Sequence, residues 1–155
     1  MPMWAKKHQS GVMMIISESA TMTTQKINFM SAEQLNERLQ SEKIPYGHIA
    51  RVCYESTKLW CELNGEKHWK NWDELNRAEK HLTFLQVFYC LDYPDTDEVQ
   101  LQHYLVISAV KEGWFIGNEY DAENKRHPHL MSDWQLPEYV KTKNKLFINI
   151  VKSLK

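Results

Sequence analysis

The chain has 155 residues, of which 43% are hydrophobic and 25% are charged, and its formal net charge is -1. This length predicts one globular domain with a core that needs neither metal nor disulfides. A near-neutral chain has no strong basic field, so composition gives no reason to expect a nucleic-acid or anionic-membrane partner.

The three cysteines indicate a reducing compartment. Cys53, Cys61 and Cys90 are an odd number and include no closely spaced pair, so we expect small buried core residues and not a disulfide framework or nucleophiles. The longest apolar run near the start covers residues 12–16, far short of the roughly 20 residues of a membrane helix. We therefore expect a cytoplasmic protein without a membrane-spanning segment.

Residues 1–30 show neither helical nor strand periodicity, which predicts a flexible leader or a true translation start at Met22. The first predicted helix follows at Ser31, because Ser31 and Gln34 have the spacing of a capping box. Pro45 and Gly47 separate it from a second helix over residues 46–63, in which apolar residues recur every three or four positions.

Two more helices are expected before the chain changes character. The first has an apolar stripe that starts at Trp72 and should end before Pro94. The second should be capped by Asp95 or Thr96 and stopped by Gly113.

The segment after Gly113 favours a small β element. Residues 114–117 are aromatic and β-branched, and residues 118–129 are polar and rich in turn formers, which is typical of a hairpin. A last helix should begin near Pro137. The predicted fold is therefore mainly α, a compact domain of four to five helices over residues 31–155, with a small β-hairpin between the last two helices.

Several motifs of this sequence together resemble the RyR domain, the ryanodine-receptor repeat. They are Gly113-Trp114-Phe115-Ile116-Gly117, Tyr120-Asp121, Lys125-Arg126-His127-Pro128-His129-Leu130, Leu136-Pro137-Glu138 and, upstream, Ile49-Ala50 with Tyr54-Glu55. The order of these motifs is closer to the small stand-alone members of bacteria and bacteriophages than to the receptor. The chain departs from the family pattern at Ile116 and Tyr54, where the family has tyrosine and histidine, and at Ser132-Asp133, where it has Pro-Tyr.

The resemblance implies a binding module without enzymatic activity for a nucleotide-derived ligand, of the ADP-ribose or cyclic nucleotide type. If the gene belongs to a phage, the module would act in the host cytoplasm, where sequestering a defence signal is a conceivable use. No cofactor is implied. The candidate ligand-binding residues are Trp114, Tyr120, Asp121, Lys125, Arg126 and His127, with Tyr54 and Glu55 as contributors from a second face.

The residue types suit that ligand, because aromatic faces stack on bases and cations pair with phosphates. The competing interpretation is structural, with Trp114 in the core and His127 fixing a turn. We do not expect a metal site at His127 and His129 with His103 or Asp121, although imidazole and carboxylate suit several divalent ions.

Two other functions stay open. The same loop could contact another protein or a second copy of the chain, and the exposed candidates for such a patch include Trp4, Trp69 and Trp134. A hydrolase acting on nucleotides through Glu55 or Asp121 is less favoured, because no nucleophile with an adjacent base is evident. Accordingly, no catalytic residue is assigned.

Overall fold

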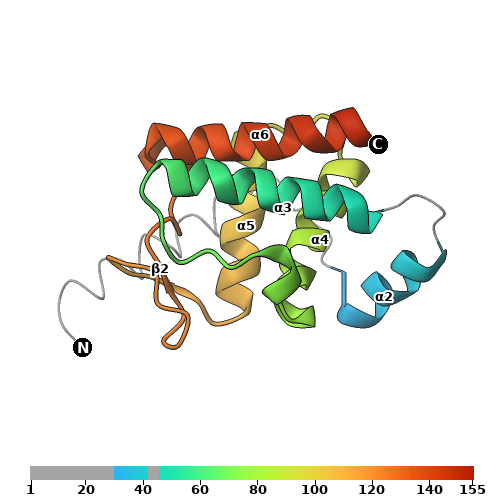
Figure 1. Ribbon diagram of the computed structural model, residues 1–155, viewed down its shortest axis with the longest axis horizontal. Helices are drawn as coiled ribbons and strands as arrows, with labels where there is room; N and C mark the ends of the chain where they lie inside the picture. Colours follow the sequence, from blue (N-terminus) through green and yellow to red (C-terminus); the bar gives the residue numbers. More distant parts are fainter. Residues whose placement is uncertain (1–29, 42–45) are drawn as a thin grey trace. The chain divides into compact units, whose positions relative to one another are not determined.

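The computed structural model describes residues 30–41 and 46–155, which belong to two compact units. One unit contains Glu98–Pro137, and the other contains the described residues up to Asp97 together with Glu138–Lys155. The elements are α2 (Ala32–Ser41), α3 (Tyr46–Leu63), η1 (Trp72–Glu74), α4 (Arg77–Asp92), α5 (Glu98–Lys111), β1 (Phe115–Ile116), β2 (Arg126–His127), η2 (Asp133–Gln135) and α6 (Glu138–Leu154) (Figure 1). The predicted mainly α class, with a small sheet between the last two helices, is confirmed. The predicted leader lies outside the described residues except for Met30.

Helix α2 begins with the predicted capping box. The Ser31 hydroxyl accepts from the Gln34 backbone N–H at 3.1 Å, and the Gln34 side chain accepts from the Ser31 N–H at 2.9 Å. Arg38 then forms two 2.8 Å hydrogen bonds to Asp92 at the end of α4, and its guanidinium lies 4.2 Å from the ring centroid of Phe88. This fork-shaped ion pair fixes α2 against α4.

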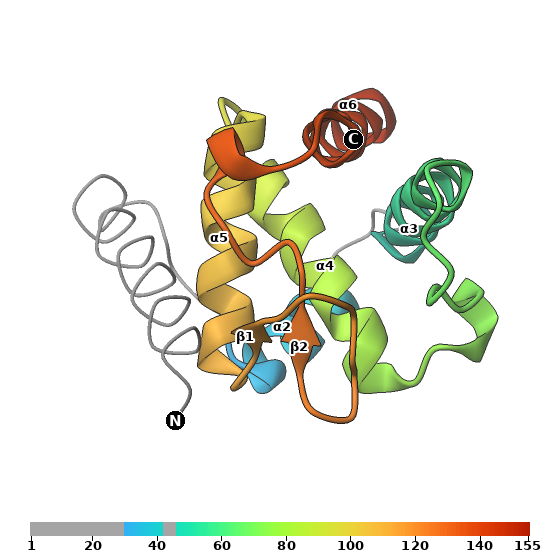
Figure 2. The same ribbon diagram turned by 90° about the vertical axis from the view of Figure 1, so that its left-hand side faces the viewer.

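Helices α3 and α6 lie side by side and run antiparallel (Figures 1 and 2). The Trp60 indole donates to the Tyr139 carbonyl at 2.8 Å, whereas Cys53, two turns earlier, approaches the Phe147 carbonyl at 3.9 Å. The bounds predicted for the second helix are confirmed, because its apolar stripe is buried and Gly65, with a φ of 98°, supplies the left-handed stop.

Helix α4 starts later than its apolar stripe predicted. Trp72 is buried at 6% exposure but belongs to the short helix η1, and α4 begins only at Arg77. The reason is the helix cap at Asn76, whose side chain accepts a hydrogen bond from the Glu79 N–H at 2.8 Å. Thr96 also differs from its predicted role as a possible cap of α5. Its hydroxyl donates to the Tyr93 carbonyl at 2.6 Å and so closes the turn before that helix.

The unit of α5 places the small sheet beside that helix (Figure 2). Gly113 has a φ of 86° and ends the helix as predicted. The Gln102 amide donates to the carbonyls of His129 and Met131, both at 2.9 Å, which holds the returning chain along α5. The two strands pair in parallel, with Phe115 opposite Arg126, instead of antiparallel as in a simple hairpin.

The buried thiols give a prediction about alkaline pH. Burial raises the pKa of Cys53, Cys61 and Cys90 from 9.0 to about 12. The folded state thus holds these protons more tightly than the unfolded chain does. Their contribution to stability is fully present below pH 9.0 and is lost as the pH rises towards about 12.

We expect the free energy of unfolding in urea to fall as the pH is raised above about 9, and the native thiols to resist iodoacetamide at about pH 8. Labelling should be complete after unfolding in urea, which serves as the control. Fast labelling of any of the three thiols in the native protein would contradict their burial.

Candidate functional site

The backbone of β1 and β2 brings the candidate segments together. The Phe115 N–H donates to the Lys125 carbonyl at 2.9 Å, and the Gly117 N–H donates to the His127 carbonyl at 3.2 Å. Glycine is required at position 117, because an added Cβ would lie 2.8 Å from the Arg126 Cβ. The tight approach fixes residues 114–117 against residues 125–127.

Asp121 shapes the turn between these strands. Its carboxylate accepts from the Asn124 side chain at 2.7 Å and from the Asn124 N–H at 3.1 Å, and these hydrogen bonds lower the pKa of Asp121. Backbone hydrogen bonds of 2.8 and 2.9 Å join Asp121 to Arg126. Lys125, with a φ of 53°, completes the reversal. The carboxylate is therefore engaged in organising the turn.

Three of the predicted site residues form a ring cluster, which we define as Trp114, Tyr120 and His127. Tyr120 lies 5.9 Å from Trp114 and 5.6 Å from His127 between ring centroids, and its ring is perpendicular to the imidazole. Trp114 and His127 are half-buried, whereas Tyr120 is 37% exposed. The cluster therefore presents the tyrosine ring to solvent on a supporting layer of two rings.

His127 has a defined tautomer in its neutral form. Its Nδ1 accepts from the His129 backbone N–H at 3.0 Å, so the ring proton is carried on Nε2. Because His129 extends from the same turn, this contact also fixes the orientation of the imidazole within the ring cluster. His127 therefore both stabilises the turn, as its structural interpretation predicted, and belongs to the ring cluster.

The two basic residues are placed differently from each other. The exposed Lys125 donates from Nζ to the Glu112 carbonyl at 2.7 Å, where a cation stabilises the C-terminal end of α5. The Arg126 guanidinium lies 4.8 Å from the ring centroid of Phe115. Since successive strand residues point to opposite faces, Arg126 and His127 occupy opposite faces of the small sheet. Arg126 is therefore separated from the ring cluster.

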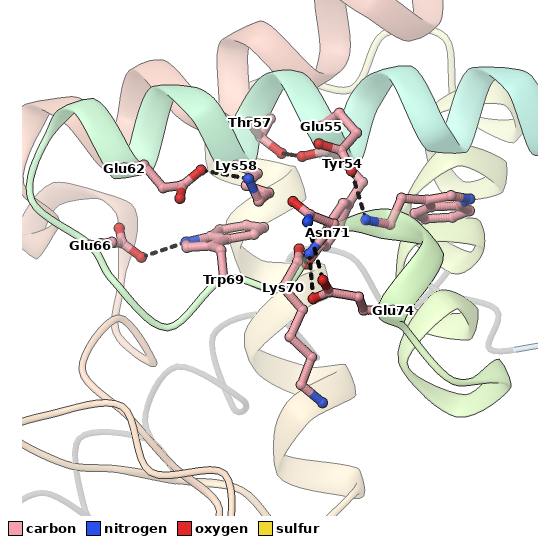
Figure 3. A network of polar contacts seen from close by, with 11 residues as sticks. Tyr54, Glu55, Thr57, Lys58, Glu62, Glu66, Trp69, Lys70, Asn71 and Glu74 are labelled. Atoms are coloured by element: carbon pink, nitrogen blue, oxygen red, sulfur yellow. Dashed lines mark hydrogen bonds and ion pairs between the residues drawn. The ribbon is translucent and has the colours of Figure 1, made fainter.

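Tyr54 and Glu55 belong to the other compact unit, where they fasten the loop after α3 (Figure 3). The Tyr54 hydroxyl donates to the Lys70 carbonyl at 2.7 Å, and its ring lies between Trp69 and Trp72 at centroid distances of 5.3 and 5.6 Å. The Glu55 carboxylate accepts from the Trp72 N–H at 2.6 Å. Both side chains position the loop, and their role as second-face ligand contacts stays a prediction.

The Glu55 contact makes a measurable prediction. Glu55→Gln exchanges a charged acceptor for a neutral one, so we expect the free energy of unfolding to fall by about 1–2 kcal/mol. Glu62→Gln on the same helix removes only the exposed contact with Lys58 and should change it by less than about 0.5 kcal/mol. Equal effects of the two variants in urea denaturation would contradict the anchoring role.

Two exposed aromatic residues of the unit that contains α5 were not assigned to the site from sequence. Phe115 is 39% exposed beneath the Arg126 guanidinium, and Trp134 in η2 is 76% exposed. Trp134 did carry a signal, since it falls outside every apolar stripe. Trp69 is half-buried, and Trp4 lies outside the described residues.

Within the described ranges, no three His, Cys, Asp or Glu side chains are grouped so that they could hold a metal ion. None of the helices described here is long and apolar enough to cross a bilayer. The His127 and His129 rings lie next to each other, with centroids 5.3 Å apart, as residues two positions apart in an extended segment share a face.

Comparison of the chain with family models, curated proteins and solved structures finds no match.

Proposed function

We propose that residues 114–130 are the recognition segment of an RyR-like binding module for a nucleotide-derived ligand, of the ADP-ribose or cyclic nucleotide type. The observation that carries this proposal is the ring cluster, in which Tyr120 is exposed and is supported by Trp114 and His127. An exposed ring with a fixed orientation offers a base a stacking surface at little cost in conformational entropy.

The basic side chains of the segment favour a ligand that carries an anionic group as well as a base. Lys125 is exposed, and Arg126 and His127 follow it directly in the sequence. Three consecutive residues therefore carry nitrogen donors. Lys125 is the cation most suited to a phosphate, because its ammonium can exchange the Glu112 carbonyl for a charged acceptor. Arg126 would serve only a ligand that reaches the other face of the sheet.

The hydrogen bonds of the two candidate carboxylates favour ligand binding without hydrolysis. Asp121 is engaged with Asn124, and Glu55 is engaged with the Trp72 N–H. Neither interaction places the carboxylate beside a serine, threonine or cysteine nucleophile. The carboxylates therefore support the fold of two loops, which a binding module requires.

The second candidate function is a protein-interaction or oligomerisation module. It is favoured by Trp134, because an indole that is 76% exposed is typical of an anchor for another chain. The partner in this alternative could be a second copy of the protein. Nucleotides would then leave the protein's stability unchanged.

A thermal-shift panel separates the two functions. ADP-ribose and cyclic nucleotides are compared with adenosine, which lacks the phosphate, and with inorganic phosphate, which lacks the ring. Binding should stabilise the fold by about 2.7 kcal/mol at a hundredfold excess over the dissociation constant, and each half alone should act more weakly. No stabilisation by any nucleotide, together with a concentration-dependent dimer in light scattering, would favour the interaction module.

A further inference from the structure

The hydrogen bond that orients His127 uses the ring nitrogen at which a histidine in this tautomer takes up a proton. Nδ1 of His127 accepts from the His129 backbone N–H at 3.0 Å, so the neutral ring carries its proton on Nε2. A proton from solvent therefore binds at the lone pair of Nδ1. Once protonated, Nδ1 is a donor and cannot accept from the His129 N–H. Protonation and this hydrogen bond exclude each other.

The backbone on both sides of this hydrogen bond is held by other contacts. The Gly117 N–H donates to the His127 carbonyl at 3.2 Å, next to the end of β1. The Gln102 side chain of α5 is buried and donates to the His129 carbonyl at 2.9 Å. Pro128 lies between the two histidines, and its ring fixes its own φ. When Nδ1 is protonated, the imidazole side chain therefore moves while the backbone stays in place.

We propose that protonation of His127, below about pH 6.5, releases its imidazole from the ring cluster and so weakens ligand recognition there. This inference rests on the proposed function, because it describes the regulation of that same site. His127 acts as a positioning residue, since its ring stands perpendicular to that of Tyr120 at 5.6 Å and lies 6.5 Å from Trp114. Without the imidazole, the exposed Tyr120 ring loses one of its two supports.

The neighbouring groups keep their charge in this pH range, with one exception. The charged side chains of the same turn are Asp121, Lys125 and Arg126. Asp121 stays ionised, because the hydrogen bonds from Asn124 lower its pKa. Tyrosine, lysine and arginine do not titrate near neutral pH, and the paired strand β1 consists of the uncharged Phe115 and Ile116. The exception is His129, whose ring lies 5.3 Å from that of His127, so it requires its own control.

NMR of the full-length protein without ligand tests the release of the imidazole. Between about pH 7.5 and about pH 5.5, the His129 backbone amide and the Trp114 indole resonances should shift with a common midpoint. The Trp60 indole, in the other compact unit, is the reference that shows the fold is retained. His127→Asn keeps an acceptor that does not titrate and should abolish both shifts, whereas His129→Gln keeps the backbone N–H and should preserve them.

Two results of this titration overturn the proposal. One is a Trp114 resonance that does not change with pH in the wild type. The other is a shift that persists in His127→Asn but disappears in His129→Gln, because the titrating group would then be His129. If His127→Asn fails to fold by circular dichroism, the wild type and His129→Gln still decide between these results.

Calorimetry with ADP-ribose at the same two pH values tests the effect on recognition. The wild type should bind about 2- to 10-fold more weakly at the acidic pH, as expected for the loss of one edge-to-face ring contact, and His127→Asn should bind equally at both. Stronger binding by the wild type at acidic pH overturns the proposal, because the imidazolium would then stay and pair with the phosphates. If ADP-ribose binds at neither pH while the ligand-free shifts depend on His127, the release of the imidazole is supported and the proposed ligand is refuted.

Discussion

Replacing Phe88 by alanine is expected to lower the free energy of unfolding by about 3–5 kcal/mol. Phe88 is fully buried in α4 and packs edge-on against Tyr46, with ring centroids 4.8 Å apart. It also lies beneath the Arg38 guanidinium. The substitution therefore leaves a cavity and removes contacts from α2, α3 and α4 together.

The control for this measurement is Leu63→Ala. Leu63 ends α3 and is 74% exposed, so its truncation should change the free energy of unfolding by less than about 0.5 kcal/mol. Both variants are compared by urea denaturation at the same pH. A loss below about 1 kcal/mol for Phe88→Ala would show that the centre of this unit is not packed as described.

The second large effect concerns ligand affinity. Tyr120→Ala should weaken binding of ADP-ribose by about 5- to 150-fold, because stacking on one aromatic ring contributes about 1–3 kcal/mol per base. The Tyr120 ring is the exposed member of the ring cluster, so its removal should leave the fold nearly unchanged. Isothermal titration calorimetry measures the change directly.

Trp134→Ala is the matched control for Tyr120→Ala. Trp134 is a larger and more exposed aromatic residue of the same compact unit, and it lies outside the ring cluster. Its loss should leave the affinity for ADP-ribose unchanged. Equal weakening by both variants would indicate a general surface effect, and a dimer lost only in Trp134→Ala would support the interaction module.

The helices could be predicted well because local signals determine them. The bounds of α3 follow from an apolar stripe between Gly47 and Gly65, and α2 follows from the Ser31 capping box. The start of α4 could not be predicted, since the stripe continues through Trp72 while the choice of cap falls on Asn76. An apolar period identifies a buried face, and it does not identify the residue at which the helix begins.

The candidate site could be predicted only in part, because its geometry depends on pairing between distant residues. The approach of Trp114, Tyr120 and His127 follows from the parallel register of Phe115 with Arg126, which composition and spacing do not specify. The same register sends Arg126 to the other face of the sheet. Likewise, the contact between Glu55 and the Trp72 N–H depends on the path of a loop that has no periodic signal.

The most direct test of nucleotide recognition follows the tryptophan indole resonances by NMR while ADP-ribose is added. Trp114→Phe assigns its resonance, and Trp60, whose indole is bonded to the Tyr139 carbonyl, is the internal reference. Binding at the ring cluster predicts a saturable shift of the Trp114 resonance with the Trp60 resonance unmoved. A Trp114 resonance that stays fixed while the ligand binds elsewhere, or does not bind at all, would contradict it.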